Sequence, residues 1–379
     1  MFRKRFNFLN FAGIQIGLDL SWLLIAILLS WTLAVGYFPF YYPGQTAGVY
    51  WLMGFLGMLG LFVCIVLHEL GHAMVAKHYH LPISQITLFI FGGIAEIKKE
   101  PQSPKVEFLM AIAGPLVSVA LAILMYLITS TGVKQGWSPL VTSITGYLAY
   151  VNAALVVFNM IPAFPLDGGR VFRSILWASS NNLGWATKIA TIVGSGFGFF
   201  LLFYGIFLFI SGNIIGGMWL AIIGLFLRRA AASTQTQYFV KKELQGEKVT
   251  KFMSTPPLTV PPNITLQTFI DQHVYQSHHH LYPVTEEGKL LGYISLNEVK
   301  NVPSTEWSQK TVADVLVPRS QFKTVPPSTN AHEALLIMQS EEVPTLLVAD
   351  GEHLVGVLTS QDLLKAISIK LELEQGESL

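Results

Sequence analysis

Long apolar stretches fill the first 230 residues, whereas the rest of the chain mixes apolar and polar positions and is punctuated by prolines. A helix of roughly 20 apolar residues can cross the hydrocarbon core of a membrane. Six such stretches lie near residues 18–38, 50–77, 106–130, 141–162, 189–211 and 214–228. The pattern therefore predicts a polytopic α-helical membrane protein with about six transmembrane helices, followed by a soluble α/β region.

The segment 83–98 follows a different pattern. Alternating apolar positions such as Ile86 and Leu88, followed by Gly92 and Gly93, are typical of a short β-hairpin rather than a helix. Non-helical backbone is tolerated at membrane depth only where protein or a water-filled cavity covers it. We therefore expect a short membrane-associated hairpin close to the functional site.

Composition supports the membrane assignment. The 379 residues are 52% hydrophobic and only 12% charged, whereas soluble domains carry about 25% charged residues. The formal net charge of +1 gives no argument for nucleic-acid binding. The single cysteine, Cys64, excludes a disulfide within the chain.

Lysine and arginine predict the orientation in the membrane. They cluster before the first apolar stretch, between the second and third, and after the fourth and sixth, whereas the alternate loops contain little more than Lys134. Because positive loops face the cytoplasm, we expect a multi-pass integral membrane protein whose N- and C-termini are both cytoplasmic. The C-terminal half of the second stretch then lies towards the cytoplasm.

The sequence His68-Glu69-Leu70-Gly71-His72 lies inside the second apolar stretch. A helix brings the i and i+4 histidines to one face, where two imidazoles can share one zinc ion, and Glu69 stands beside them as a general base for the attacking water. The alternative is a pair of buried histidines with local partners. Three ionisable groups in a membrane-length helix are costly, which favours a functional site.

Catalytic zinc usually has three protein ligands and one open position. The strongest candidate for the third ligand is Asp167, which follows Pro162 and Pro165 in a break of the fourth stretch and precedes Gly168-Gly169. A carboxylate on such a turn can reach a neighbouring helix. The alternative for Asp167 is the N-cap of a following helix over Val171–Ala178.

The combination of HExxH in one transmembrane helix with Asn159-x-x-Pro-x-x-Pro-Leu-Asp-Gly-Gly in a later one resembles the site-2 protease family of intramembrane zinc metalloproteases (M50 peptidases). The resemblance covers roughly residues 13–230, includes Phe91-Gly92-Gly93-Ile94-Ala95, and suggests a protease domain over 1–230. It implies one Zn²⁺ bound by His68, His72 and Asp167, with catalytic roles for Glu69 and Asn159. The Asn159 amide could face the developing oxyanion, or it could form a helix–helix hydrogen bond.

The resemblance implies hydrolysis of peptide bonds in or near transmembrane segments, as in regulated intramembrane proteolysis. Membrane-tethered regulators such as transcription factors or anti-sigma factors are the expected substrates. A transmembrane helix hides its amides in hydrogen bonds, so such a substrate must unwind locally. The edge of the 83–98 hairpin is the expected place for the unwound segment to bind by strand addition.

The polar tail repeats itself. Thr259-Val260-Pro261-Pro262 matches Thr324-Val325-Pro326-Pro327, and Gly292-Tyr293-Ile294-Ser295 matches Gly356-Val357-Leu358-Thr359. Two homologous units of about 60 residues are expected to pack as a pair. The repeats resemble CBS domains, which form a Bateman module, and we expect the two domains at 246–303 and 309–370.

In the CBS family a Ser or Thr with an Asp three residues later often contacts an adenine nucleotide. The second repeat has both, Thr359 and Asp362, whereas the first has Ser295 and the longer acid Glu298. The resemblance therefore implies binding of AMP, ADP or ATP. The alternative is a pair that serves only as a scaffold or as the surface of a homodimer.

A rival function is a membrane transporter or channel gated by the CBS pair, because such tails also occur on ion-transport proteins. In that case His68, Glu69, His72 and Asp167 would line an ion path. The i, i+4 spacing of two histidines around a glutamate is a hydrolase arrangement and favours the protease.

Overall fold

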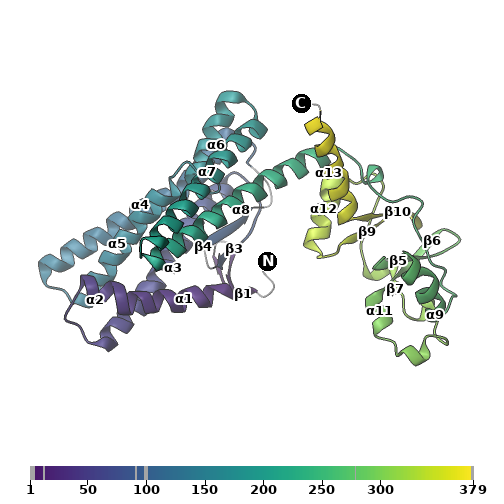
Figure 1. Cartoon of the computed structure of the whole chain (residues 1–379), viewed down its shortest axis with the longest axis horizontal. Coiled ribbons are helices and arrows are strands. Elements are labelled where there is room, and N and C mark those ends of the chain that lie inside the picture. Colours follow the sequence, from purple (N-terminus) through teal and green to yellow (C-terminus); the bar gives the residue numbers. More distant parts are fainter. Residues whose placement is uncertain (1–4, 12, 90–91, 98–100, 278, 377–379) are drawn as a thin grey trace. The chain divides into compact units, whose positions relative to one another are not determined.

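The computed structural model describes residues 5–11, 13–89, 92–97, 101–277 and 279–376 (Figure 1). Its contacts divide the chain into two compact units, Met1–Gln235 and Thr236–Leu379. Six of the described helices are long and apolar enough to cross a membrane. The predicted fold class, a polytopic helical membrane protein with a soluble α/β region, is confirmed.

The helices of the first unit follow the apolar stretches closely. The first span is built from α1 (Ser21–Thr32), a π-helical turn (Leu33–Tyr37) and α2 (Phe38–Tyr41). The other five spans are α3 (Ala47–His78), α4 (Pro104–Gln135), α5 (Pro139–Asn159), α7 (Leu183–Ile210) and α8 (Ile214–Leu244). The shorter helix α6 (Asp167–Ser180) is amphipathic and is not among these spans.

The predicted hairpin is part of a larger sheet. Strands β3 (Ile83–Phe89) and β4 (Gly92–Ile97) pair antiparallel as expected, whereas Phe91 lies outside the described residues. Two strands that were not predicted, β1 (Arg5–Phe11) and β2 (Ile14–Asp19), extend the sheet in the order β1-β2-β3-β4. Because β2 pairs parallel to β3, the sheet ties the start of the chain to the segment that follows α3.

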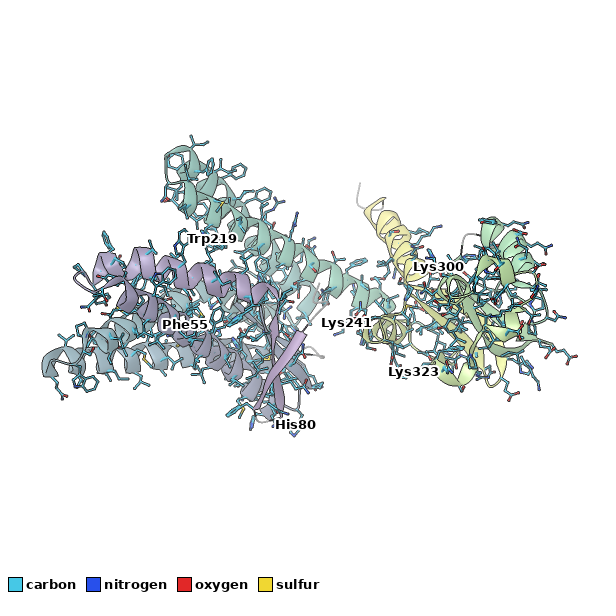
Figure 2. All side chains as sticks on the ribbon, turned by 90° about the horizontal axis from the view of Figure 1, so that it is seen from below. Phe55, His80, Trp219, Lys241, Lys300 and Lys323 are labelled. Atoms are coloured by element: carbon cyan, nitrogen blue, oxygen red, sulfur yellow. The ribbon has the colours of Figure 1, made fainter. Side chains whose placement is uncertain are left out.

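Helix α3 lies at the centre of the first unit and packs against α1, α4 and α5. The buried side chains Phe38, Met53 and Tyr147 form one of its apolar clusters. Many apolar side chains are exposed, such as Phe55 (labelled in Figure 2), whose exposed fraction is 50%. Such an apolar outer surface is expected of helices surrounded by lipid.

The second unit is built on one mixed sheet. Its main strand order is β5-β6-β10-β9-β8, and β7 pairs with β6. The strands are β5 (Leu281–Glu286), β6 (Lys289–Ser295), β7 (Val317–Pro318), β8 (Thr324–Val325), β9 (Thr345–Asp350) and β10 (His353–Thr359). The helices are α9 (Leu266–Phe269), α10 (Tyr275–Ser277), α11 (Leu296–Lys300), α12 (Ala331–Ser340) and α13 (Ser360–Gly376). Short 3₁₀ turns at 249–251, 304–306, 312–314 and 319–321 and a π turn at 270–274 complete it.

Each repeat of the second unit has its own apolar core, and the two cores exchange segments. Val312, which follows the first repeat in sequence, is buried in the core with Leu266 and Ile294. Conversely, Leu244, which precedes the first repeat, and Val249, near its start, are buried in the core of the second. The two repeats therefore interlock as a pair, while the limits 246–303 and 309–370 stay predictions.

Candidate metal centre

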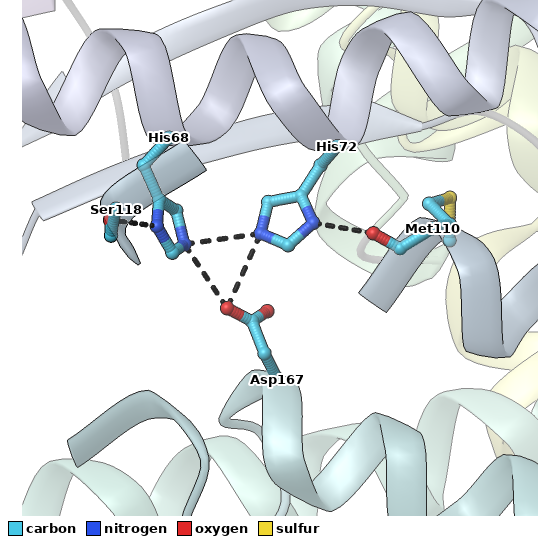
Figure 3. Close-up of polar contacts among 5 residues, drawn as sticks. All are labelled: His68, His72, Met110, Ser118 and Asp167. Carbon is cyan, nitrogen blue, oxygen red and sulfur yellow. Dashed lines mark hydrogen bonds and ion pairs between the residues drawn. The ribbon is translucent and has the colours of Figure 1, made fainter. Parts of the chain in front are cut away.

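Helix α3 presents its two histidines on one face, as the i, i+4 spacing predicts. Both are nearly buried, with exposed fractions of 5% for His68 and 4% for His72. Their Nε2 atoms lie 3.2 Å apart (Figure 3). The two ring nitrogens are therefore close enough to bind the same ion.

The carboxylate of Asp167 completes this group. Its Oδ2 atom lies 3.1 Å from His68 Nε2 and 3.3 Å from His72 Nε2. Asp167 is the first residue of α6, and Leu166 takes the N-cap position. The helix thus begins four residues before the predicted Val171, and Asp167 does not serve as its N-cap. Among the described residues, His68, His72 and Asp167 form a group of the kind that can hold a metal ion.

Helix α4 fixes the orientation of both imidazoles from the opposite side. His72 Nδ1 lies 2.7 Å from the backbone carbonyl oxygen of Met110, and His68 Nδ1 lies 2.9 Å from Ser118 Oγ. Because a carbonyl oxygen only accepts, Nδ1 of His72 carries a proton, and Nε2 of the neutral ring presents its lone pair. Such outer hydrogen bonds orient metal-binding histidines in known sites. Sequence reasoning missed both partners.

The three ligand atoms fit a zinc ion. The two Nε2 atoms and Asp167 Oδ2 converge on one point, where a single cation could contact all three. Zinc–ligand bonds of about 2.0–2.2 Å in a tetrahedron place the ligand atoms roughly 3.4 Å apart, and the separations here are 3.1, 3.2 and 3.3 Å. Two imidazoles and one carboxylate are also a common ligand set of catalytic zinc.

Gly114 of α4 leaves the space in which the imidazoles lie. A Cβ atom at this position would be 2.2 Å from His72 Nε2 and 2.6 Å from His68 Nε2. Real Cβ atoms essentially never approach other atoms so closely. Glycine at position 114 is therefore a requirement of the histidine geometry, and this was also missed in the sequence.

Glu69 lies against strand β4. A Cβ atom on Gly93 would be 2.6 Å from Glu69 Cγ and 3.3 Å from its Oε1. The glutamate also lies close enough to His68, His72 and Asp167 to interact with them electrostatically. The predicted base and the predicted hairpin are thus brought together beside the three candidate ligands.

Asn159 is the last residue of α5, eight positions before Asp167 in the sequence. The segment between them contains a cis peptide bond at Phe164-Pro165. The side chain of Asn159 is partly exposed, and the catalytic role of Asn159 stays a prediction.

The four residues predicted to contact a nucleotide cap helices in the second unit. Ser295 and Glu298 form a capping box at the start of α11, and Thr359 Oγ1 donates to Asp362 Oδ2 at 2.7 Å at the start of α13. Ser295 and Glu298 also line a cleft of about 460 Å³ together with Tyr293, Phe322 and Lys323 among others, whereas Thr359 and Asp362 are not in its lining. Burial and the neighbouring Glu298 carboxylate raise the pKa of the Tyr293 phenol.

Comparisons with known proteins agree with both parts of the chain. The family model described as Peptidase family M50 matches residues 56–137 and 134–203, and the CBS domain model matches 249–304 and 312–369. The Mycobacterium tuberculosis protein named "Putative zinc metalloprotease Rip3" is 32% identical over 94% of this chain and 91% of its own length. "Zinc metalloprotease MJ0392" of Methanocaldococcus jannaschii is 33% identical over 83% of this chain and 85% of its own. The solved site-2 protease from the same organism is 29% identical, covers 61% of this chain and 95% of that one, and gives a TM-score of 0.41.

Proposed function

The chain is a zinc metalloprotease of peptidase family M50 with a C-terminal pair of CBS domains, and we propose that it hydrolyses peptide bonds in or near the transmembrane segments of membrane-tethered proteins. The observation that carries this proposal is the convergence of His68, His72 and Asp167 next to Glu69, on and beside helices able to span a membrane. The transporter or channel alternative is not retained, because the family is one of peptidases.

In this proposal His68, His72 and Asp167 hold the zinc ion. When bound, zinc polarises the scissile carbonyl and makes water a stronger nucleophile at neutral pH. Glu69 accepts a proton from the attacking water and passes it to the leaving amide nitrogen. Asn159 donates a hydrogen bond to the developing oxyanion.

The unwound substrate segment binds to the outer edge of β4. This strand is at the end of the order β1-β2-β3-β4, and its residue Gly93 touches Glu69. An extended peptide paired with that edge would therefore lie beside the general base. Proline substitutions at alternate positions of β4 should reduce cleavage and leave the zinc content intact, and unchanged cleavage would exclude this binding mode.

The catalytic assignment is tested by Glu69→Gln in the full-length protein. The variant should retain zinc and lose cleavage of a reporter with a single transmembrane helix. Glu333→Gln, an exposed glutamate on α12, is the matched control and should cleave at the wild-type rate. Cleavage by Glu69→Gln at that rate would reject the role of Glu69 as the base.

The natural substrates are proposed to be membrane-tethered regulators such as anti-sigma factors or transcription factors. A pull-down of membrane proteins with Glu69→Gln as a trap would identify them. Enrichment of no membrane-helix protein over the wild type would count against this class.

Both termini are proposed to face the cytoplasm, as the lysine and arginine distribution favours. Reporters that are active only on one side of the membrane, fused to each terminus, test this orientation. Activity of either fusion on the non-cytoplasmic side would contradict it.

The CBS pair is proposed to bind an adenine nucleotide, to regulate proteolysis and to form a homodimer. The cleft lined by Ser295 and Glu298 supports ligand binding, although the Glu298 carboxylate faces Ser295 within the capping box. Equilibrium dialysis of the full-length protein with labelled AMP and ATP, and cleavage rates with each, test the first two points. The mass of the purified protein in detergent, after correction for bound detergent, tests the third.

A further inference from the structure

A buried ion pair joins the helix that carries Asp167 to the helix that orients the two histidines. Arg173 of α6 donates from Nε to Glu107 Oε1 of α4 at 2.7 Å. The side chains are almost fully enclosed, with exposed fractions of 7% for Arg173 and 1% for Glu107. This pair has no part in the proposed chemistry, so its placement needs another explanation.

A buried ion pair is weak evidence for stability alone, because taking two charges out of water costs about as much as their attraction returns. Such a pair does fix geometry, since the planar guanidinium directs both Nε and Nη2 of Arg173 at Glu107 Oε1. Glu107 Oε2 has no hydrogen-bond partner among the described residues. Arg170, one turn earlier on α6, also interacts electrostatically with Glu107. Both arginines of α6 therefore interact with the same carboxylate on α4.

The same arginine also holds the turn before Asp167. The guanidinium carbon of Arg173 lies over the ring of Phe164, 5.0 Å from its centroid. The backbone of Phe164 touches α6 and α7, because a Cβ atom on Gly169 would be 2.3 Å from its nitrogen and one on Gly194 would be 2.0 Å from its oxygen. Arg173 thus contacts both the turn that precedes Asp167 and, through Glu107, helix α4.

Glu107 and the groups that orient the histidines lie along one face of α4. Met110 and Ser118 contact His72 and His68, and Glu107 binds Arg173. Positions three, seven and eleven residues after 107 lie on the same helix face. A translation or rotation of α4 would therefore move the groups that contact the histidines together with the group that binds α6.

We propose that Glu107 and Arg173 are positioning residues that set the distance between the Asp167 carboxylate and the two imidazoles. This inference rests on the proposed role of Asp167 as a zinc ligand. Neither residue touches the ion or the substrate. Loss of the pair lets the first turn of α6 move, so that Asp167 no longer stays within 3.1 Å of His68 Nε2.

The test is the zinc affinity of the full-length protein, measured by competition with a chelator. Glu107→Gln should lower the affinity about 10–100-fold, which is the usual effect of removing a group that supports a metal ligand. In an Asp167→Asn background the same substitution should have almost no further effect, because the ligand that it positions is already lost. Arg173→Lys, which keeps the charge but not the fork, should lose less than Arg173→Gln.

Ser118→Ala is the matched control on the same helix. It loosens His68 rather than Asp167, so it should lower the affinity by the same factor in both backgrounds. An equal loss for Glu107→Gln in both backgrounds would show a general structural effect and overturn the inference. An affinity unchanged by Asp167→Asn alone would instead reject Asp167 as a ligand, so the two failures are distinguishable.

A second measurement does not depend on the metal. The Arg170 amide donates to the Leu166 carbonyl at 3.1 Å and reports on the first turn of α6. In metal-free protein, hydrogen exchange of peptides that cover 167–170 should accelerate in Glu107→Gln, while exchange around 68–72 on α3 stays unchanged. No acceleration at 167–170 would overturn the proposal even if Asp167→Asn bound zinc too weakly to measure.

Discussion

Gly114→Ala tests the metal centre most directly, because one added methyl group enters the space of two candidate ligands. The new Cβ atom would stand 2.2 Å from His72 Nε2 and 2.6 Å from His68 Nε2. Alanine is otherwise a better residue than glycine in a helix interior, by about 0.5–1 kcal/mol. Any loss of zinc binding would therefore come from the site rather than from weakening of α4.

The size of the effect follows from these distances. Ordinary contacts of a Cβ atom begin near 3.4 Å, so His72 would have to withdraw by about 1.2 Å and His68 by about 0.8 Å. Neither ring can do so while its Nδ1 keeps the contacts to Met110 and Ser118. Zinc sites tolerate ligand displacements of only about 0.2 Å. We expect the zinc affinity to fall at least about 100-fold, or about 2.8 kcal/mol.

Chelator competition on the purified full-length protein measures this loss, and cleavage of a transmembrane reporter should fall with it at limiting zinc. Gly196→Ala is the control, since it lies in the membrane-spanning helix α7 and has no atom within 4 Å of the added Cβ. It should keep wild-type affinity and activity. Wild-type zinc affinity in Gly114→Ala would refute the argument that the two imidazoles and α4 form the metal site.

Three further predictions concern the base, the metal and the second unit. Gly93→Ala would add a Cβ atom 2.6 Å from Glu69 Cγ, so kcat should fall by about 100-fold with unchanged zinc content. An equal loss of zinc would contradict an effect confined to the base. Dialysis against a chelator should abolish cleavage and added Zn²⁺ should restore it, whereas cleavage by metal-free protein would contradict the assigned chemistry. Leu244→Ala removes a fully buried side chain from the core of the second repeat and should destabilise that unit by about 2–5 kcal/mol without changing zinc affinity; calorimetry would show a lower transition for the second unit, and an unchanged transition would exclude the packing role.

The membrane helices and the HExxH site could be predicted because their signals are local. A spanning helix needs a long apolar run, and His68, Glu69 and His72 are conspicuous where a charge is costly. Asp167 was found for the same reason, since few carboxylates lie near the apolar stretches. These features depend on composition and spacing within one segment.

The strands β1 and β2 could not be predicted in the same way. They are short, and β2 pairs with β3 across more than sixty residues, between Gln15–Leu18 and Gln85–Leu88. Such pairing depends on which segments the helices bring together, and a local pattern does not contain this information. The hairpin alone was therefore predicted where a four-stranded sheet exists.

The sequence predicts the start of α6 too late, at Val171, because Gly168 and Gly169 suggest a turn. In the structure they are the first residues after Asp167 within the helix. A Cβ atom on Gly168 would be 2.4 Å from the Met160 carbonyl carbon, so glycine permits a close approach of backbones here. The sequence shows the two glycines, but the need for them comes from contacts between segments and cannot be predicted from this segment alone.

Gly114, Ser118 and Glu107 show why the support of a metal site is harder to find than its ligands. Glycine and serine in an apolar helix usually serve close helix packing, and a glutamate near a helix N-terminus usually favours the helix dipole. Only their common face on α4 distinguishes them. Because that face contacts both histidines and α6, the ligand geometry depends on the rotation of α4. The imidazoles of such a site find their hydrogen-bond partners within the protein, because lipid offers none.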